Sequence, residues 1–306
     1  MPPTEPILIL GTGALACLFA ARYSAAGVPV TMLGTWPAGL ESIRQQGVRL
    51  VVAGGREQAY LVQAVDNPHA CTGARQALVL VKSWQTGRAA SHLAVCLAED
   101  GLALTLQNGL GNQQVLEGAL GASRVALGVT TVGANLLGPG RVRPAGEGKI
   151  TLGEHAGIDR MAEGLHKAGF TVETTSDPTG LLWGKLVINA AINPITALLG
   201  IVNGELLERP EARWLAAATA REAAEVAQAQ GIHLPYPDPE AAVEGVAGRT
   251  AVNRSSMLQD VQREAPTEID AICGAIVLAG EQWGVPTPVN RTLWMLVKAI
   301  NKQKIQ

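Results

Sequence analysis

Short apolar runs alternate with helix-like segments through the first half of the chain. Ile7–Leu10 is apolar without interruption, which is typical of a strand buried on both faces. The segment 15–26 is rich in Ala and Leu and is expected to form a helix that ends near Gly27. Further strands are expected at 28–33, 77–81 and 102–106. This alternation predicts a parallel sheet with crossover helices.

The pattern changes twice farther along the chain. Strand-like stretches at 125–131 and 149–153, with the turn sequence Gly138-Pro139-Gly140 between them, predict an antiparallel extension of the sheet. After about Thr179 the periodicity is helical throughout. We therefore expect an α/β domain over residues 1–178 and an all-helical domain over 179–306. The expected helices of that second domain are 181–199, 211–230, 239–248, 267–283 and 289–300.

Composition and charge exclude several classes of partner. The 306 residues carry 24 basic and 26 acidic side chains, a net charge of −2, so we expect no nucleic-acid binding. The longest apolar stretch, 186–202, is interrupted by polar residues and falls short of about 20 apolar residues, so we expect no membrane span. The four cysteines form no CxxC pair and so lack the spacing of a structural zinc or redox dithiol site. With no secretory signal visible, a cytoplasmic location is expected.

A glycine motif lies between the first strand and the first helix. Gly11 allows a tight turn, Gly13 allows the backbone to approach a pyrophosphate, and Ala16 is small enough for close helix packing. A glycine-rich turn occurs in other α/β proteins as well, but its place in the first strand-turn-helix unit favours a dinucleotide. The motif predicts a Rossmann-type domain whose cofactor-binding residues are Gly11, Thr12, Gly13, Ala14, Leu15 and Ala16.

Two more polar residues follow expected parallel strands. Lys82 follows the strand at 77–81, and Asn108 follows the strand at 102–106. Ligands of open α/β sheets bind at the carboxyl ends of the strands, so both residues are candidates to lie near the nicotinamide half of a cofactor. A surface lysine and a turn asparagine are the structural alternatives.

The catalytic candidate is found by elimination. The five histidines form no constellation, no tyrosine has a lysine four positions later, and no Cys/His metal set is visible. What remains is Lys185, Asn189 and Asn193, which are spaced four residues apart in an apolar helix and so share one face. Burying such a stripe is costly unless it meets polar partners. The alternative is a solvated helix face.

A second polar region lies near the C-terminal end. It comprises Ser255–Asp260 and Thr267–Asp270, the latter at the start of an expected helix. From spacing alone, ordinary capping by acids in the first turn is the favoured interpretation of Glu268.

These motifs together resemble the ketopantoate reductase (2-dehydropantoate 2-reductase) family over nearly the whole chain. The resemblance rests on the glycine motif, Lys82-Ser-Trp-Gln, Asn108-Gly, the segment 183–197, Asn203-Gly-Glu-Leu, Ser255–Asp260 and Thr267–Asp270. It implies an oxidoreductase that reduces 2-dehydropantoate to (R)-pantoate with NADPH, in pantothenate and coenzyme A synthesis. Two alternatives stay open: a related reductase of another 2-keto acid or imine, and a nucleotide sensor without catalysis.

The resemblance also implies roles for single residues. Lys185 would be the general acid, and Glu268 the acid that pairs with it and with the substrate. Asn189, Asn193 and Ser256 would hold the substrate, with Asn108 beside the nicotinamide. A homodimer through the Ala- and Leu-rich C-terminal helices is a further expectation.

The sequence departs from the family at the expected cofactor-selecting position. Thr35 stands after the second strand, where an arginine would bind the 2′-phosphate of NADPH. No acid stands there either, so the usual signature for NADH is also missing. We expect NADPH with a modest preference, within about tenfold, and NADH as a usable substitute. A strong preference would point to another basic residue, with Arg44 and Lys82 as candidates.

Overall fold

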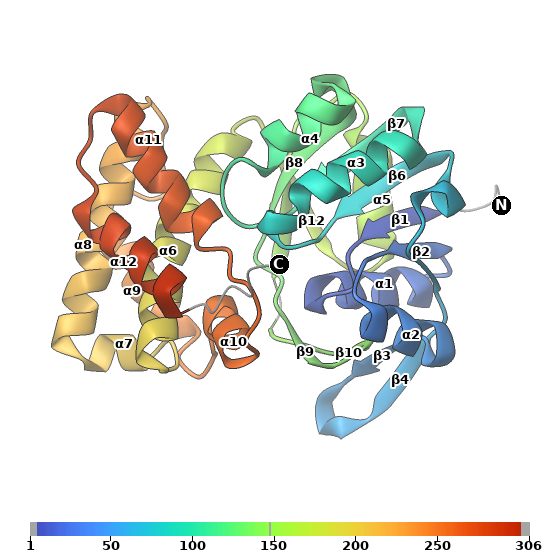
Figure 1. Ribbon diagram of the computed structural model, residues 1–306, viewed down its shortest axis with the longest axis horizontal. Helices are drawn as coiled ribbons and strands as arrows, with labels where there is room; N and C mark the ends of the chain where they lie inside the picture. The colour runs from blue at the N-terminus through green and yellow to red at the C-terminus, as the bar shows by residue number, and fades with distance from the viewer. Residues whose placement is uncertain (1–4, 147, 301–306) are drawn as a thin grey trace. The chain divides into compact units, whose positions relative to one another are not determined.

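The computed structural model describes residues 5–146 and 148–300, and its chain forms two compact units (Figure 1). The first unit comprises residues 1–107 and 112–178, and the second comprises 108–111 and 179–306. The short segment 108–111 therefore belongs to the helical unit, although both of its flanking segments belong to the α/β unit.

The first unit is built on an eight-stranded sheet, in the order β12-β11-β8-β7-β6-β1-β2-β5. Neighbouring strands in this described sheet are parallel, except that β8 and β11 are antiparallel. The predicted parallel sheet with an antiparallel extension is thus confirmed. The strands are β1 (Ile7–Leu10), β2 (Val30–Leu33), β5 (Gln63–Val65), β6 (Ala74–Val79), β7 (Leu97–Thr105), β8 (Val125–Thr130), β11 (Lys149–Gly153) and β12 (Thr171–Thr175).

Strand β1 shows why its sequence is apolar without interruption. Ile7 and Ile9 belong to one hydrophobic core, whereas Leu8 and Leu10 belong to another. Successive side chains of a strand point to opposite faces, so a strand covered on both faces needs apolar residues at every position. The first core includes α1 (Ala14–Ala25) and α5 (Ile158–Lys167), and the second includes α3 (Thr86–Cys96) and α4 (Asn112–Leu120).

A second sheet corrects one expectation from the sequence. The turn at Gly138-Pro139-Gly140 joins a hairpin that does not extend the main sheet but pairs with a strand near residue 50. Arg49 and Ser42 both donate hydrogen bonds to the carbonyl oxygen of Pro139, at 2.9 and 2.8 Å. Pairing across about 90 residues leaves no local signal in the sequence. This sheet has the order β4 (Glu57–Tyr60), β3 (Val48–Val51), β10 (Arg141–Pro144), β9 (Ala134–Gly138), and helix α2 (Pro37–Gln46) precedes β3 (Figure 1).

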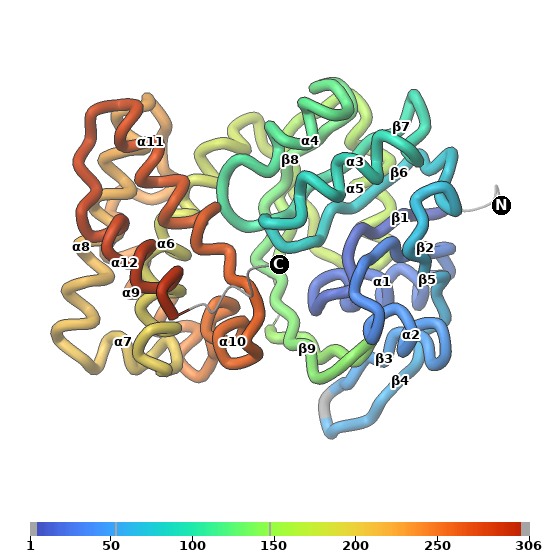
Figure 2. The backbone as a smooth tube through the Cα atoms, viewed as in Figure 1, coloured from blue at the N-terminus to red at the C-terminus, as the bar shows by residue number. Residues whose placement is uncertain are grey.

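The second unit is helical, as expected, and Figure 2 follows its chain from yellow-green to red. Its helices pack around one core of buried Leu, Ile, Val and Ala side chains. A π-helical turn, Asp270–Gly274, stands where the sequence predicted the first turns of an α-helix. The helices are α6 (Pro178–Leu199), α7 (Glu205–Glu208), α8 (Pro210–Ala229), α9 (Pro239–Arg249), α10 (Ser256–Gln262), α11 (Ala275–Trp283) and α12 (Pro288–Ile300).

Helix α6 spans 22 residues and contributes many of the buried side chains of this core. Among the described residues it alone is long and apolar enough to cross a membrane, and 67% of its most apolar window is buried inside the protein. Pro194 lies within the helix and has no N–H to donate to the carbonyl of Ala190. The thiol of Cys273 contacts that carbonyl oxygen instead, at 4.0 Å. The proline is therefore accommodated without a break in α6.

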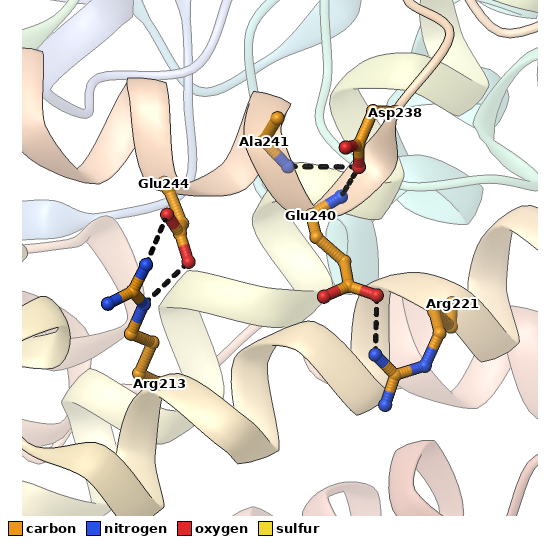
Figure 3. A network of polar contacts seen from close by, with 6 residues as sticks. All are labelled: Arg213, Arg221, Asp238, Glu240, Ala241 and Glu244. Atoms are coloured by element: carbon orange, nitrogen blue, oxygen red, sulfur yellow. Dashed lines mark hydrogen bonds and ion pairs between the residues drawn. The ribbon is translucent and has the colours of Figure 1, made fainter.

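Ion pairs and caps fix the outer helices (Figure 3). Arg213 of α8 donates two hydrogen bonds to Glu244 of α9, at 2.6 and 2.8 Å, and Arg221 pairs with Glu240. Asp238 caps α9 by accepting from the N–H groups of Glu240 and Ala241, at 2.9 and 3.1 Å. The charged partners are partly exposed, so each pair stabilises only modestly.

Candidate active site

Two glycines shape the turn between β1 and α1. Gly11 has φ +120°, and a Cβ there would stand 3.1 Å from the carbonyl oxygen of Leu80. Gly13, directly before α1, is exposed and has no atom within 4 Å of the position of a Cβ. Ala16 is fully buried in the first core. A tight turn with open space at a helix N-terminus fits the pyrophosphate of a dinucleotide, because the free N–H groups of the helix can donate to it.

Thr12 connects this turn to the end of β2. Its side chain is buried, and its Cγ2 would lie only 2.7 Å from a Cβ at Gly34. Gly34 must therefore be small for the two segments to meet. Thr35 follows and is exposed, and the guanidinium of Arg88 in α3 donates to its hydroxyl at 3.3 Å.

Arg44 and Lys82 are the two other basic residues considered from the sequence. Arg44 donates to the carbonyl oxygen of Ala64 at 2.8 Å and to the carboxylate of Asp66 at 3.3 Å. Lys82 is partly buried and immediately precedes the 3₁₀ turn Ser83–Gln85, after β6. Arg88 is not recognisable from the sequence as a neighbour of Thr35, because 53 residues separate the two and no local pattern joins them.

A buried polar network underlies the start of α3. The hydroxyl of Thr86 lies 2.8 Å from the carbonyl oxygen of Ser83 and 2.7 Å from Oδ1 of Asn112. Gln107 donates to the same hydroxyl at 2.8 Å and to the carbonyl oxygen of Val81 at 3.0 Å. These side chains, which sequence reasoning missed, fix the N-terminal end of α3 to the ends of β6 and β7.

In the second unit, the polar stripe of α6 lies where its spacing predicts. Lys185 and Asn189 are partly buried, and Asn193 is 6% exposed. None of the three is an exposed residue, so the stripe is not a solvated helix face. Below it, the hydroxyl of Thr196 is hydrogen-bonded to that of Ser255, 2.8 Å away. Ser255 also caps α10 by accepting from Leu258.

Ser256, the serine proposed from the resemblance, is the first residue of α10 and is partly buried. Its neighbour Ser255 makes the contacts that join α10 to α6. Ser255 therefore has a structural role, and substrate binding by Ser256 stays a prediction.

The charge of Lys185 is set by two opposing influences. Desolvation by the surrounding apolar residues lowers the pKa of Lys185 to about 8, and the carboxylate of Glu268 partly opposes that shift. An ammonium group with a pKa this close to neutrality is still mainly protonated at pH 7, yet it releases its proton far more readily than an ordinary lysine. These are properties required of a general acid.

Glu268 contacts the segment 108–111, which lies in the first half of the sequence but belongs to the helical unit. Glu268 as a residue is 6% exposed, and its carboxylate accepts a hydrogen bond from the side-chain amide of Asn108 at 3.3 Å. The N–H of Leu110 donates to the carbonyl oxygen of Ala271 at 2.9 Å. Gly109 has φ +82°, and a Cβ there would clash with that same carbonyl. The segment 108–111 therefore packs directly on the π-helical turn after Glu268.

The structure thus brings Lys185, Glu268 and Asn108 into one neighbourhood. Capping was the favoured interpretation of Glu268 from spacing alone, but its carboxylate accepts from a side chain 160 residues away. The π-helical turn that follows is a feature often found at functional sites. An amide, a carboxylate and an ammonium held together in a mostly buried setting can bind a polar substrate and exchange a proton with it.

Comparison with known proteins gives a consistent result. Residues 7–157 match the family Ketopantoate reductase PanE/ApbA, and residues 178–301 match its C-terminal domain family, Ketopantoate reductase PanE/ApbA C terminal. A 2-dehydropantoate 2-reductase of Archaeoglobus fulgidus is 38% identical, over 97% of this chain and 98% of that protein. One of Halobacterium salinarum is 34% identical, over 95% of this chain and 97% of that protein.

Solved structures show the same similarity. A PanE/ApbA family ketopantoate reductase from Ralstonia eutropha superposes with a TM-score of 0.91 at 32% identity, covering 99% of this chain and 100% of that one. A D-mandelate dehydrogenase with NADH and anilino(oxo)acetate gives a TM-score of 0.91 at 25% identity, covering 97% and 98%. From its matched domains, its full-length relatives and its fold, the chain belongs to the ketopantoate reductase family of oxidoreductases.

Proposed function

We propose that this protein catalyses the NADPH-dependent reduction of 2-dehydropantoate to (R)-pantoate, a step of pantothenate and coenzyme A synthesis. The names of its full-length relatives support this substrate. The observation that carries the proposal is the partly buried Lys185, whose pKa is lowered to about 8, in the neighbourhood of the Asn108–Glu268 hydrogen bond.

The reaction needs a proton at the keto oxygen, and in this proposal Lys185 supplies it. A bound reduced nicotinamide supplies the hydride. The ammonium of Lys185 attracts the carboxylate of a 2-keto acid and donates a hydrogen bond to its carbonyl oxygen. As negative charge develops on that oxygen, the ammonium stabilises it and transfers the proton. A pKa near 8 keeps the group charged at neutral pH and lowers the cost of the transfer.

The remaining polar residues orient the substrate. Glu268 accepts a hydrogen bond from the substrate hydroxyl and keeps Lys185 protonated through its negative charge. Asn108 fixes the Glu268 carboxylate by its amide, and it lies beside the nicotinamide in this proposal. Asn189, Asn193 and Ser256 hold the carboxylate and the keto group of the substrate.

NADPH is the proposed cofactor, bound at the turn of Gly11–Ala16 with Lys82 near its nicotinamide half. The position after β2 carries no carboxylate that would repel a 2′-phosphate or accept from a 2′-hydroxyl. A threonine hydroxyl and the guanidinium of Arg88 stand there instead. NADH is expected to bind at the same turn with lower affinity.

A steady-state assay of the purified protein tests the proposal. Oxidation of NADPH and of NADH is followed with ketopantoate, pyruvate and phenylglyoxylate at matched concentrations. The proposal requires kcat/KM to be highest for ketopantoate with NADPH.

The similarity to the D-mandelate dehydrogenase structure favours a second candidate. That candidate is a reductase of 2-keto acids with aromatic side chains that uses NADH. Higher kcat/KM for phenylglyoxylate with NADH would establish that candidate instead.

We also propose that the protein forms a homodimer through its C-terminal helices. Leu278 in α11 and Met295 and Leu296 in α12 are large apolar side chains that are about half-exposed, and apolar surface of this kind is what an interface between subunits would cover. Light scattering on an eluting column peak measures the mass directly. The dimer proposal predicts twice the chain mass for the protein and a lower mass for Leu278→Glu, whereas a monomeric parent protein would contradict it.

A further inference from the structure

The expected arginine after β2 is absent from the sequence, yet the structure supplies a guanidinium at the same place. Nη1 of Arg88 lies 3.3 Å from Oγ1 of Thr35, and both residues are exposed. Thr35 follows the carboxyl end of β2, where the 2′-position of an adenine ribose is recognised in Rossmann-type domains. The charge therefore comes from α3 and not from the loop after β2.

Arg44 and Lys82, the other basic residues considered for this role, have different surroundings. Arg44 pairs with Asp66 and with a backbone carbonyl oxygen, so its charge offsets that of a neighbouring acid. Lys82 follows β6, which is separated from β2 by β1 in the sheet. Arg88, in contrast, donates a hydrogen bond to Thr35 itself.

Arg88 is also held on a rigid support. It lies in the first turn of α3, whose N-terminal end is fixed by the buried Thr86, Gln107 and Asn112 network. The hydroxyl of Thr35 accepts from Arg88, which leaves its own proton available for donation. A guanidinium and a hydroxyl fixed side by side form a pair of donors that suits a phosphate group.

We propose that Arg88 and Thr35 together bind the 2′-phosphate of the adenosine half of the cofactor, and that Arg88 is the residue that selects NADPH over NADH. This inference rests on the proposed use of NADPH. It replaces the expectation of a preference within about tenfold at Thr35, and it differs from the two other basic candidates considered from the sequence, Arg44 and Lys82. Because the contact is exposed and charged, it weakens as the salt concentration rises.

Calorimetric titration of the folded protein with adenosine 2′,5′-bisphosphate and with adenosine 5′-monophosphate isolates the contact, because the two probes differ only in the 2′-phosphate. Arg88→Met removes the charge and keeps an apolar stem, Thr35→Val removes the hydroxyl, and Arg160→Met in α5 removes a charge from an exposed position elsewhere. NADPH and NADH are titrated in parallel.

The parent protein is expected to bind the bisphosphate roughly 10- to 100-fold more tightly than the monophosphate, as one charge-assisted contact allows. Arg88→Met should bring this ratio close to one without changing the affinity for the monophosphate or for NADH. Thr35→Val should lower the ratio by a smaller factor, and Arg160→Met should preserve it. The preference of the parent protein should also decrease with added potassium chloride, whereas that of Arg88→Met should not.

If Arg88→Met keeps the preference for the bisphosphate over the monophosphate, the inference is wrong. Loss of that preference in Lys82→Met, with Arg88→Met unaffected, would assign the role to Lys82 instead. A ratio near one in the parent protein overturns both this inference and the proposed use of NADPH. In that case, turnover of ketopantoate with NADH would show that the proposed reductase activity itself stands.

Discussion

The phenolic hydroxyl of Tyr236 donates a hydrogen bond to the carbonyl oxygen of Gly184 at 2.7 Å, one residue before Lys185. Pro235 packs at the same point, because a Cβ on Gly184 would stand 2.5 Å from its Cδ. The loop between α8 and α9 thus braces α6 next to the proposed general acid. Gly184 is small because Pro235 and Tyr236 occupy the space of a side chain.

Replacing Gly184 by alanine should therefore disturb both packing and catalysis. The added methyl group overpacks the contact with Pro235, which we expect to cost about 1–3 kcal/mol of unfolding free energy. A shift of α6 should also lower kcat by at least about tenfold, since small misplacements of catalytic groups are costly. Thermal unfolding and steady-state kinetics measure the two effects.

Gly118→Ala in α4, where the Cβ meets open space, is the control and should leave kcat unchanged. Normal kcat in a folded Gly184→Ala protein would show that the brace does not position Lys185.

Lys185→Ala should lower kcat by roughly 10²- to 10⁴-fold, the range expected for loss of a positioned proton donor. NADPH affinity should persist, because the glycine turn is in the other unit. Stopped-flow measurement of hydride transfer, with fluorescence titration of NADPH, separates the two quantities. Lys167→Ala, at the end of α5, is a matched control that should behave like the parent protein. Turnover close to normal in Lys185→Ala would remove this residue from the mechanism.

The pH dependence of reduction follows from the lowered pKa of Lys185. The protonated ammonium is the active form, so kcat/KM should be level below about pH 8 and fall roughly tenfold per pH unit above it. The carboxylate of Glu268 raises this pKa against the larger effect of desolvation. Glu268→Gln removes that negative charge, so the alkaline limb should move to lower pH. A limb that stays in place would show that another group controls the profile.

Glu268→Ala distinguishes a substrate-binding role from a helix-capping one. A role in the site predicts a higher KM and a lower kcat with little change in melting temperature. A capping role predicts a loss of about 0.5–2 kcal/mol of unfolding free energy with the kinetics intact. Asn108→Ala serves as the companion variant, because it removes the donor to the Glu268 carboxylate and leaves the π-helical turn in place. Measuring Tm and kcat/KM on the same samples decides between the two roles.

Much of the fold could be predicted from local patterns. The unbroken apolar run Ile7–Leu10 is a strand between two cores, and the four-residue spacing of Lys185, Asn189 and Asn193 lies on one helix. These predictions held because each depends on the periodicity of a single element. The turn at Gly138–Gly140 was recognised as a turn, but its sheet was assigned wrongly, since its partner strand is far away in sequence.

The parts of the site that could not be predicted are all contacts between distant residues. Arg88 meets Thr35, Asn108 meets Glu268, and Tyr236 meets Gly184 across 53, 160 and 52 residues. Spacing along a chain carries no information about such pairs. The lowered pKa of Lys185 belongs to the same class, because desolvation depends on which apolar side chains surround the ammonium after folding.

Because the segment 108–111 belongs to the helical unit, that unit is not encoded by one continuous stretch of sequence. A gene fragment encoding only residues 179–306 would lack Asn108, the amide donor to Glu268, and Leu110, which donates to Ala271. Exchanging the helical unit between members of this family would therefore separate a carboxylate from its hydrogen-bond donor unless these four residues are exchanged with it. Compatibility at this short segment, more than at the junction near Pro178, should limit which chimaeric reductases are active.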